Sequence, residues 1–200
     1  MKHGFIRVAA ATPHIRLADC GYNANQLIKL IEIAEEKEVK LLVFPELCIT
    51  GYTCGDLFFQ ETLLSSAKEQ LKRVADSTRD KELVAVAGFP FEYNGKIYNT
   101  AAVMQRGKIL GLVPKMNIPN FSEFYELRYF APGHKEVIKV NFLGEEVYFG
   151  SGLLFECIDL PDFVLGVEIC EDLGVPLSPG TFIVWQEPQY WPIFPPAMNW

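Results

Sequence analysis

The sequence predicts a mixed α/β domain, and three observations support this fold class. Short apolar runs alternate with amphipathic stretches of helical length in the first half, tight-turn signals separate apolar runs in the second half, and 50% of the 200 residues are hydrophobic. Such alternation is typical of strands joined by helical crossovers, and the turn signals are typical of antiparallel hairpins. A chain of this length and apolar content can bury one substantial core.

The first half of the chain carries the crossovers. Strand-like apolar runs occupy residues 5–11, 40–44 and 83–89. We expect one amphipathic helix after the first run, capped within residues 23–25, and a second over residues 62–79. The predicted order of this half is therefore β-α-β-α-β.

The second half is predicted to form hairpins. Turns at residues 93–96 and 105–108 join apolar runs, and residues 137–149 alternate apolar and polar positions around a turn. Between them, residues 115–130 are polar and aromatic and indicate a loop with a short helix around residues 122–126. Together with the crossovers, these hairpins predict a mixed sheet with helices on at least one face.

The apolar run at residues 163–167 precedes Cys170, Glu171 and Asp172. It is predicted to be a strand buried on both faces, followed by a helix or turn that begins at the two carboxylates. At such a strand end, nearby backbone N–H groups would favour the thiolate, which makes Cys170 a candidate nucleophile. The alternative is that Cys170 is a small hydrophobe that fills the sheet.

The charge of the chain argues against two classes of partner. The formal net charge is −7, from 25 acidic and 18 basic residues. Nucleic acids and anionic membranes require a basic face, so neither is expected to bind. There is no apolar run of membrane-spanning length and no signal peptide before the first strand, so we expect a cytoplasmic protein that acts on a small molecule.

The cysteines and histidines give no metal or disulfide pattern. The five cysteines are an odd number without a CxxC pair, and the three histidines are scattered. We therefore expect reduced thiols, no structural zinc and no bound metal.

Three predicted strands end close to a residue that can carry chemistry, namely Glu46, Lys115 and Cys170. Strand ends in a mixed sheet can gather at one rim. A carboxylate that takes the thiol proton, a thiolate that attacks the carbonyl carbon and an ammonium that stabilises the oxyanion are sufficient for acyl transfer from an amide. Taken singly, Glu46 and Lys115 could equally be solvated surface charges, and spacing alone does not bring the three together.

The local sequences around these residues carry a resemblance. The chain resembles the Glu, Lys and Cys signatures of the nitrilase (carbon-nitrogen hydrolase) superfamily, in the family's order, at residues 44–52, 114–120 and 166–173. It further resembles the glutaminase domain of glutamine-dependent NAD(+) synthetases at residues 51–58, 122–130 and 159–163. The resemblance runs from about Val8 to Pro179.

This resemblance implies a fold and a set of catalytic roles. The fold would be a nitrilase-type α-β-β-α sandwich, incomplete at its C-terminus. Glu46 would be the general base, Lys115 the oxyanion stabiliser and Cys170 the nucleophile that forms a glutamyl thioester. Glu126 matches a second glutamate that holds the lysine and the leaving group in place.

The resemblance also implies residues that bind the substrate. Tyr52, Phe121 and Glu171 match positions around the bound glutamine, with Glu171 on its α-ammonium group. Alternatively, Tyr52 is a core aromatic with a satisfied hydroxyl, and Glu171 is a carboxylate at a helix start. Phe121 stands where members often have tyrosine, which loses a hydroxyl, and Gly174 where they usually have tryptophan, which loses a pocket wall.

The implied activity is hydrolysis of L-glutamine to glutamate and ammonia, with the ammonia used for ATP-dependent synthesis of NAD(+) from nicotinate adenine dinucleotide. No cofactor is expected in this domain, because ATP and nicotinate adenine dinucleotide would bind a synthetase domain that this sequence lacks. Domains of this type commonly pair, so a homo-oligomer is expected for the full-length family. Two alternatives remain: a stand-alone amidase of the same superfamily, and a non-catalytic fragment or binding module.

The last stretch of the chain differs from the rest. Residues 181–200 hold all three tryptophans and four of the 13 prolines. The genetic code offers a test of this stretch. When the reading frame is shifted by one base, the codon that spans Trp185 and Gln186 can encode only Ala, and the codon that spans Tyr190 and Trp191 can encode only Leu. The other shifted codons permit the whole string L-A-G-A-T-V-L-A-N-I-S-A-S-N-E-L. That string resembles the family's continuation.

We therefore expect a truncated glutaminase domain over residues 1–180 and a frameshifted tail over residues 181–200. Loss of the later strands would expose apolar surface at Val164 and Leu165 and impair activity. The alternative is a genuine interaction segment.

Overall fold

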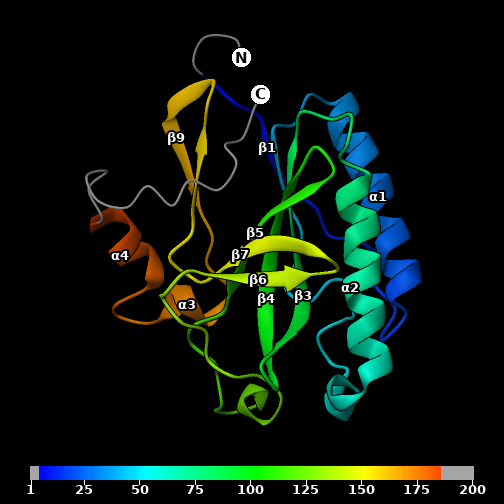
Figure 1. Cartoon of the computed structure of the whole chain (residues 1–200), viewed down its shortest axis with the longest axis vertical. Coiled ribbons are helices and arrows are strands. Elements are labelled where there is room, and N and C mark those ends of the chain that lie inside the picture. The colour runs from blue at the N-terminus through cyan, green and yellow to red at the C-terminus, as the bar shows by residue number, and fades with distance from the viewer. Residues whose placement is uncertain (1–4, 186–200) are drawn as a thin grey trace.

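The computed structural model describes residues 5–185, which form one large sheet, a smaller two-stranded sheet and flanking helices (Figure 1). The strands are β1 (Val8–Ala10), β2 (Leu41–Val43), β3 (Val84–Tyr93), β4 (Lys96–Gln105), β5 (Lys108–Pro114), β6 (Ile138–Phe142), β7 (Glu145–Phe149), β8 (Leu154–Cys157) and β9 (Leu160–Gly166). The helices are α1 (Cys20–Glu36), α2 (Glu61–Asp76), α3 (Glu171–Gly174) and α4 (Pro179–Trp185), with short 3-10 turns η1 (Gly55–Phe59) and η2 (Glu126–Arg128).

The large sheet is mixed, as the sequence predicts. Its seven strands run in the order β1-β2-β3-β4-β5-β7-β6, and β8 pairs with β9 in the separate sheet. The pairs β1–β2, β2–β3 and β5–β7 are parallel, whereas β3–β4, β4–β5 and β6–β7 are antiparallel. The helical crossovers therefore produce the parallel half of the sheet and the tight turns produce the hairpins.

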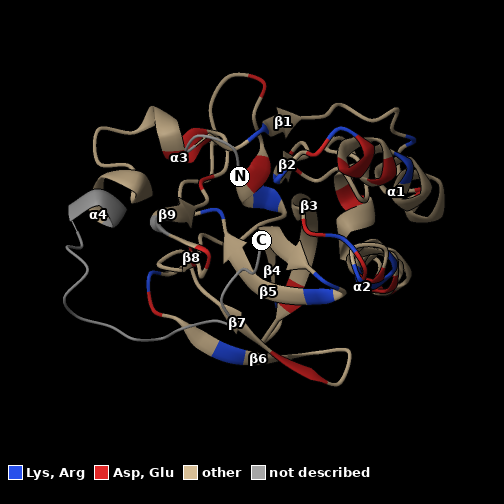
Figure 2. Ribbon diagram, turned by 90° about the horizontal axis from the view of Figure 1, so that it is seen from above, with Lys and Arg blue, Asp and Glu red and all other residues tan. Residues whose placement is uncertain are grey.

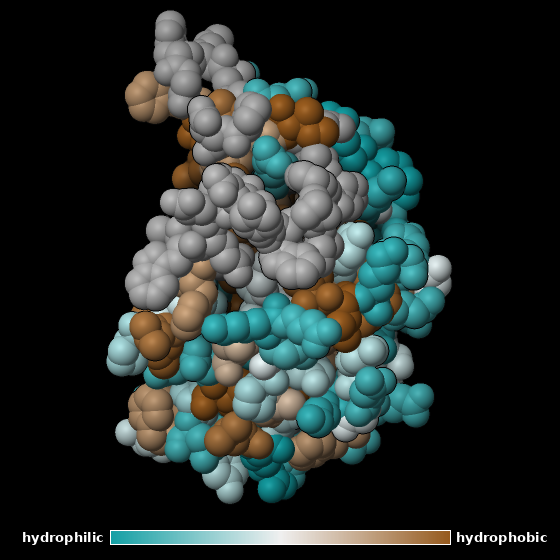
Figure 3. Space-filling model, turned by 60° about the vertical axis from the view of Figure 1, so that its left-hand side comes forward, coloured by the Kyte–Doolittle hydropathy of each residue, from teal (hydrophilic) through white to brown (hydrophobic). Residues whose placement is uncertain are grey.

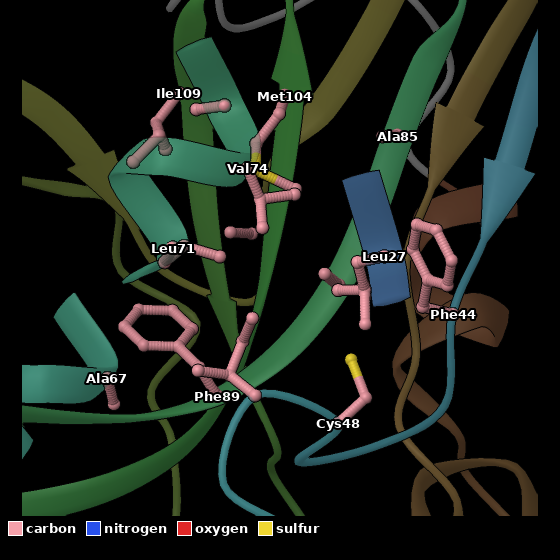
Figure 4. Packing of buried hydrophobic residues seen from close by; sticks show 14 of the residues in the cluster. Leu27, Phe44, Cys48, Ala67, Leu71, Val74, Ala85, Phe89, Met104 and Ile109 are labelled. Carbon is pink, nitrogen blue, oxygen red and sulfur yellow. The ribbon is translucent and has the colours of Figure 1, made fainter. Parts of the chain in front are cut away.

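The two long helices cover one face of the large sheet. Figure 4 shows Leu27 of α1 and Leu71 and Val74 of α2 pointing toward Phe89 and Met104 of the central strands. The apolar stripe of each helix is thus removed from water against strands that are themselves buried, which is the main stabilising contribution of this layer.

The opposite face of the large sheet packs against the smaller one. Val86 of β3 and Val103 of β4 belong to a second buried cluster together with Leu153 and Phe155, which lie at the start of the β8–β9 hairpin. Figure 2 shows α1 and α2 on one side of the large sheet, and β8, β9, α3 and α4 on the other. The predicted α-β-β-α layering is therefore present, with a second sheet of two strands among the described residues.

Three local expectations were wrong. Helix α1 begins at Cys20 with Asp19 as its N-cap, whose side chain accepts a hydrogen bond from Tyr22 N. Asn23 does not cap the helix, because its buried side-chain amide donates to the carbonyl oxygens of Arg16 and Ile49. A tertiary use of this amide thus overrides the local capping signal.

The second wrong expectation concerns the short helix within residues 115–130. The structure has a 3-10 turn at Glu126–Arg128 instead of a helix around residues 122–126. The backbone N–H of Glu126 donates to Pro119 O, so that the loop folds back on itself before the turn begins.

The third concerns β9, which is buried on one face only. Val164 is 49% exposed, since the β8–β9 hairpin packs on the large sheet with one side. Figure 3 shows the side of the molecule to which β9 and α3 belong, and hydrophobic atoms are visible at its surface between hydrophilic ones. The expected exposure of apolar surface is confirmed at Val164, whereas Leu165 is half-buried.

Two further findings bear on the sequence-based expectations. Among the described helices, none combines the length and the apolar composition that a membrane crossing requires. Within the segment predicted to be a frameshifted tail, residues 181–185 continue helix α4 and residues 186–200 lie outside the described part of the chain. The frameshift stays a prediction.

Candidate active site

Lys115 is the centre of the candidate site. It follows β5 directly and is completely buried, and its Nζ lies 2.7 Å from Glu46 Oε1 and 2.9 Å and 3.0 Å from the two carboxyl oxygens of Glu126. The backbone N–H of Lys115 donates to Asn99 O at 2.8 Å, which extends the β4–β5 ladder by one residue. A buried ammonium group is tolerated when such partners surround it.

The environment of Lys115 keeps it charged. Burial by itself lowers the pKa of the ammonium group, but the hydrogen bonds and negative charges of Glu46 and Glu126 outweigh this effect and the pKa is raised above its ordinary value. Lys115 therefore carries a full positive charge at neutral pH, next to two carboxylates.

Glu46 is placed by a close approach between its loop and β3. The backbone N–H of Phe44 donates to Val86 O, and that of Ile49 donates to Gly88 O. A Cβ atom at residue 88 would lie 2.3 Å from the backbone nitrogen of Leu47, a distance that no real side chain tolerates. Gly88 was not among the residues predicted for the site, although a glycine inside an apolar strand is a known signal of close backbone approach.

A second group holds the Glu46 carboxylate. The side-chain Nδ2 of Asn99 donates to Glu46 Oε1 at 2.5 Å, the same oxygen that Lys115 contacts. Asn99 lies in β4 and is only 1% exposed. Nothing in the local sequence marked it as part of the site.

Glu126 and Tyr52 form the other side of the lysine. Glu126 is 4% exposed and accepts a hydrogen bond from the Tyr52 hydroxyl at 2.6 Å. Desolvation, this hydrogen bond and the nearby negative charges raise the pKa of Tyr52, so its hydroxyl remains a donor. Tyr52 is 37% exposed and is therefore not a core aromatic.

Cys170 occupies a sharp turn before α3. Its backbone has a positive φ of 49°, which is unusual for a residue with a side chain and orients it away from the path of the preceding segment. All five cysteines lie among the described residues and are free thiols, and Cys170 alone is exposed. Its position as the N-cap of α3 confirms that a helix begins at Glu171.

The resting form of Cys170 is the thiol. Desolvation and then the negative charge of Glu46 raise its pKa above the ordinary value, while Lys115 and the backbone N–H of Glu171 lower it to a lesser extent. The backbone N–H of Glu171 favours the thiolate, as the sequence predicts, but desolvation and the neighbouring carboxylate outweigh this effect. A base is therefore needed to remove the proton.

Asp172 ties the Cys170 turn to the Lys115 turn. It is 2% exposed and accepts hydrogen bonds from the backbone N–H groups of Met116 (3.0 Å), Asn117 (2.7 Å) and Ile169 (3.3 Å), and from the Asn117 side chain (2.9 Å). Sequence reasoning treated Asp172 only as a helix-start residue. Its buried carboxylate instead fixes two segments that are distant in sequence.

Cys170, Glu46 and Asn99 line one small pocket of about 120 Å³. The pocket lies between the two sheets, where Gly88 and Val167 also contribute to its wall. A larger hollow of about 470 Å³ lies elsewhere, and none of its lining residues belongs to the site described here. The small pocket is therefore where a substrate carbonyl could meet both the thiol and the carboxylate.

The three predicted substrate-binding residues, Tyr52, Phe121 and Glu171, do not line this pocket. Phe121 is 55% exposed and packs edge-on against Phe124, with ring centroids 5.7 Å apart. The Glu171 side chain folds back along α3, since a Cβ atom at Gly174 would lie 3.6 Å from its carboxyl carbon. Contact of Tyr52, Phe121 and Glu171 with glutamine stays a prediction.

The geometry agrees with the comparison to known families. The carbon-nitrogen hydrolase model matches residues 7–181. The chain belongs to the carbon-nitrogen hydrolase family. This match confirms the family resemblance of the three signature segments.

Named relatives of the chain are glutamine-dependent NAD(+) synthetases. The protein from Mycobacterium bovis is 42% identical over 178 residues, which cover 89% of this chain and 26% of the relative. The protein from Acinetobacter baylyi is 35% identical over 86% of this chain and 28% of its own length. The chain thus spans about a quarter of the relatives that it matches.

Solved structures show the same fold. The glutamine-dependent NAD(+) synthetase from Cytophaga hutchinsonii superposes with a TM-score of 0.76 at 29% identity, covering 83% of this chain and 28% of that one. An amidase from a Nesterenkonia species has a TM-score of 0.58 at 22% identity, with 74% and 56% covered. The mixed α/β architecture of the nitrilase superfamily is therefore confirmed.

Proposed function

We propose that the chain hydrolyses the side-chain amide of L-glutamine to glutamate and ammonia through a thioester on Cys170. The observation that carries this proposal is the buried Lys115 ammonium held between Glu46 and Glu126, with Cys170 and Glu46 lining the same pocket. The glutamine dependence of the named relatives supports the choice of substrate.

In the first half of the reaction, Glu46 takes the proton of the Cys170 thiol and the sulfur attacks the amide carbon. The carbonyl oxygen becomes an oxyanion. Lys115 Nζ contacts one oxygen of Glu46 and both oxygens of Glu126. When the two oxygens of Glu126 share one N–H, the third N–H donor of Lys115 is left for the oxyanion. Collapse of the intermediate breaks the C–N bond, and the nitrogen leaves as ammonia with the proton that Glu46 returns.

In the second half, water hydrolyses the thioester. Glu46 removes a proton from the water and the hydroxide adds to the acyl carbon. The C–S bond then breaks to release glutamate, and Glu46 returns its proton to the departing sulfur, which restores the Cys170 thiol. Glu126 does not move protons in this scheme. It holds Lys115 through two contacts and is itself held by Tyr52, which fixes the oxyanion donor in position.

The ammonia is proposed to serve an ATP-dependent synthesis of NAD(+) from nicotinate adenine dinucleotide, in a synthetase that would bind both molecules outside these 200 residues. The length of the relatives supports this, since the chain matches 26% of the Mycobacterium bovis protein. Pairing of full-length chains and a cytoplasmic location belong to the same proposal.

The test is an amide panel. Purified chain is incubated with L-glutamine, L-asparagine and acetamide, ammonia and the product acid are measured, and acid-quenched samples are analysed by intact mass for an acyl adduct on Cys170. We expect turnover of glutamine above the other amides and a glutamyl adduct. Preference for a simple amide would favour a stand-alone amidase, and absence of any turnover and adduct would favour a non-catalytic module.

A further inference from the structure

Asn99 lies where the general base and the oxyanion stabiliser meet. Its Nδ2 donates to Glu46 Oε1, and its backbone oxygen accepts the N–H of Lys115. In the β3–β4 ladder it stands opposite Pro90 on the side of the sheet that faces the pocket with Ala101. One residue therefore contacts Glu46 with its side chain and Lys115 with its backbone.

The orientation of the Asn99 amide is fixed by charge. A carboxylate only accepts hydrogen bonds, so the NH₂ end of the amide must face Glu46 and the oxygen must face away. Among the described residues, Asn99 Oδ1 is the one buried side-chain oxygen or nitrogen for which no hydrogen-bond partner is found. Leaving a buried acceptor unpaired destabilises the folded state, so the gain of this arrangement must lie elsewhere.

The contacts of Glu46 are unequal. Both Asn99 Nδ2 and Lys115 Nζ bind Oε1, and no described residue donates a hydrogen bond to Oε2. The second oxygen is thus the one that is available to a proton from the pocket, in a side chain that retains 18% exposure.

We propose that Asn99 is a positioning residue for Glu46, which holds Oε1 together with Lys115 so that Oε2 receives the proton of the Cys170 thiol. This inference rests on the proposed glutamine hydrolysis for its catalytic meaning. Its structural part is independent of activity: the amide of Asn99 stabilises the ionised carboxylate, at the cost of its own unpaired oxygen.

The first experiment does not need turnover. Asn99→Asp replaces the NH₂ donor by a second acceptor of the same shape, and the melting temperature of this variant and of the unsubstituted chain is measured from pH 8 to pH 5. At pH 8 the two carboxylates repel each other, and we expect a decrease of roughly 5 °C. As the pH falls, the pair binds one proton, which restores a hydrogen bond, so the deficit shrinks.

The direction of this pH dependence tests whether residue 99 contacts the Glu46 carboxylate. In folded Asn99→Asp, the carboxyl groups of residue 99 and Glu46 bind their first proton with a raised pKa. The variant therefore regains stability as the pH falls and loses it as the pH rises. A deficit that stays constant over the whole pH range would overturn the inference, because no carboxylate would then face residue 99.

The second experiment measures kinetics. Asn99→Leu, which has a similar shape without polar atoms, should lower kcat for glutamine about 10- to 100-fold with little change in KM, and should move the acid limb of the kcat/KM profile to higher pH. Asn117→Ala is the matched control, because it also removes an amide that donates to a buried carboxylate, that of Asp172, without touching Glu46. We expect its acid limb to stay in place.

The outcomes separate the two proposals. If the unsubstituted chain does not hydrolyse glutamine, the proposed function fails, whereas the melting experiment still decides whether Asn99 holds Glu46. If glutamine is hydrolysed and Asn99→Leu retains the kcat and the pH profile of the unsubstituted chain, the positioning role is refuted and the proposed function stands.

Discussion

The two halves of the candidate site are held by different means. In the half with Glu46, Lys115 and Glu126, Glu46 follows β2, Lys115 follows β5 and Glu126 begins η2, and the lysine between the two carboxyl groups is fully buried. The nucleophile half, with Cys170, lies in an exposed turn that follows a hairpin of two strands. The first half is fixed by several buried side-chain hydrogen bonds around Lys115, whereas the second depends on one buried carboxylate, that of Asp172.

This difference indicates where each half is vulnerable. A charged network inside a sheet fails when one charge is removed, because the remaining charges are left unpaired. The exposed turn of Cys170 instead tolerates loss of that side chain. It loses its position when its tether, the hydrogen bonds that Asp172 accepts, is removed. Four substitutions, one at each of Cys170, Lys115, Asp172 and Glu46, test this contrast.

Replacing the nucleophile should separate activity from stability. We expect Cys170→Ala to lower glutamine turnover by at least about 10⁴-fold, because no other exposed thiol is present among the five cysteines. Since the side chain is exposed, the melting temperature should change little. Residual turnover within tenfold of the unsubstituted chain would refute the nucleophile assignment.

Replacing the lysine should do the opposite and damage the fold. Lys115→Met leaves Glu46 and Glu126 side by side in a buried site, which we expect to reduce the free energy of unfolding by about 3–5 kcal/mol. Urea denaturation measures the change. Lys139→Met is the matched control, since that lysine pairs with Glu146 at the surface, and its stability should be unchanged within error.

Cutting the tether should affect the nucleophile half alone. In Asp172→Asn, an NH₂ group faces backbone N–H donors of Met116, Asn117 or Ile169, which we expect to cost about 1–3 kcal/mol of stability. Turnover should fall further than the stability loss explains, because Cys170 moves relative to Lys115. Turnover that falls only in proportion to the folded fraction would argue against a tether.

The smallest effect concerns the titration of Cys170. Because the Glu46 charge raises the pKa of the thiol, Glu46→Gln should lower that pKa, and the pH profile of Cys170 alkylation by iodoacetamide should shift to lower pH. Peptide mass analysis follows the modified cysteine, and Glu123→Gln at the surface serves as control. A shift to higher pH would contradict the electrostatic coupling of the two groups.

The sequence singled out the candidate catalytic residues but not the residues that hold them in place. Glu46, Lys115 and Cys170 stand in distinctive local sequences, and the contacts of Glu46 and Glu126 with Lys115 agree with the roles that the resemblance implies. Asn99 and Asp172 act on partners that are 53 and 55 residues away, so that no local pattern could report them. Propensity likewise misplaced the start of α1, because the long-range bonds of Asn23 decided its role.

The close approach at Gly88 has a consequence for variation in this family. The position has no side chain, no charge and no place in the reaction, yet even one methyl group there would push against the backbone that carries Glu46. In a screen of random substitutions, residue 88 would therefore be as intolerant as the nucleophile itself. A position can therefore be intolerant to substitution because two main chains approach closely there, and such intolerance does not by itself mark a residue that takes part in the chemistry.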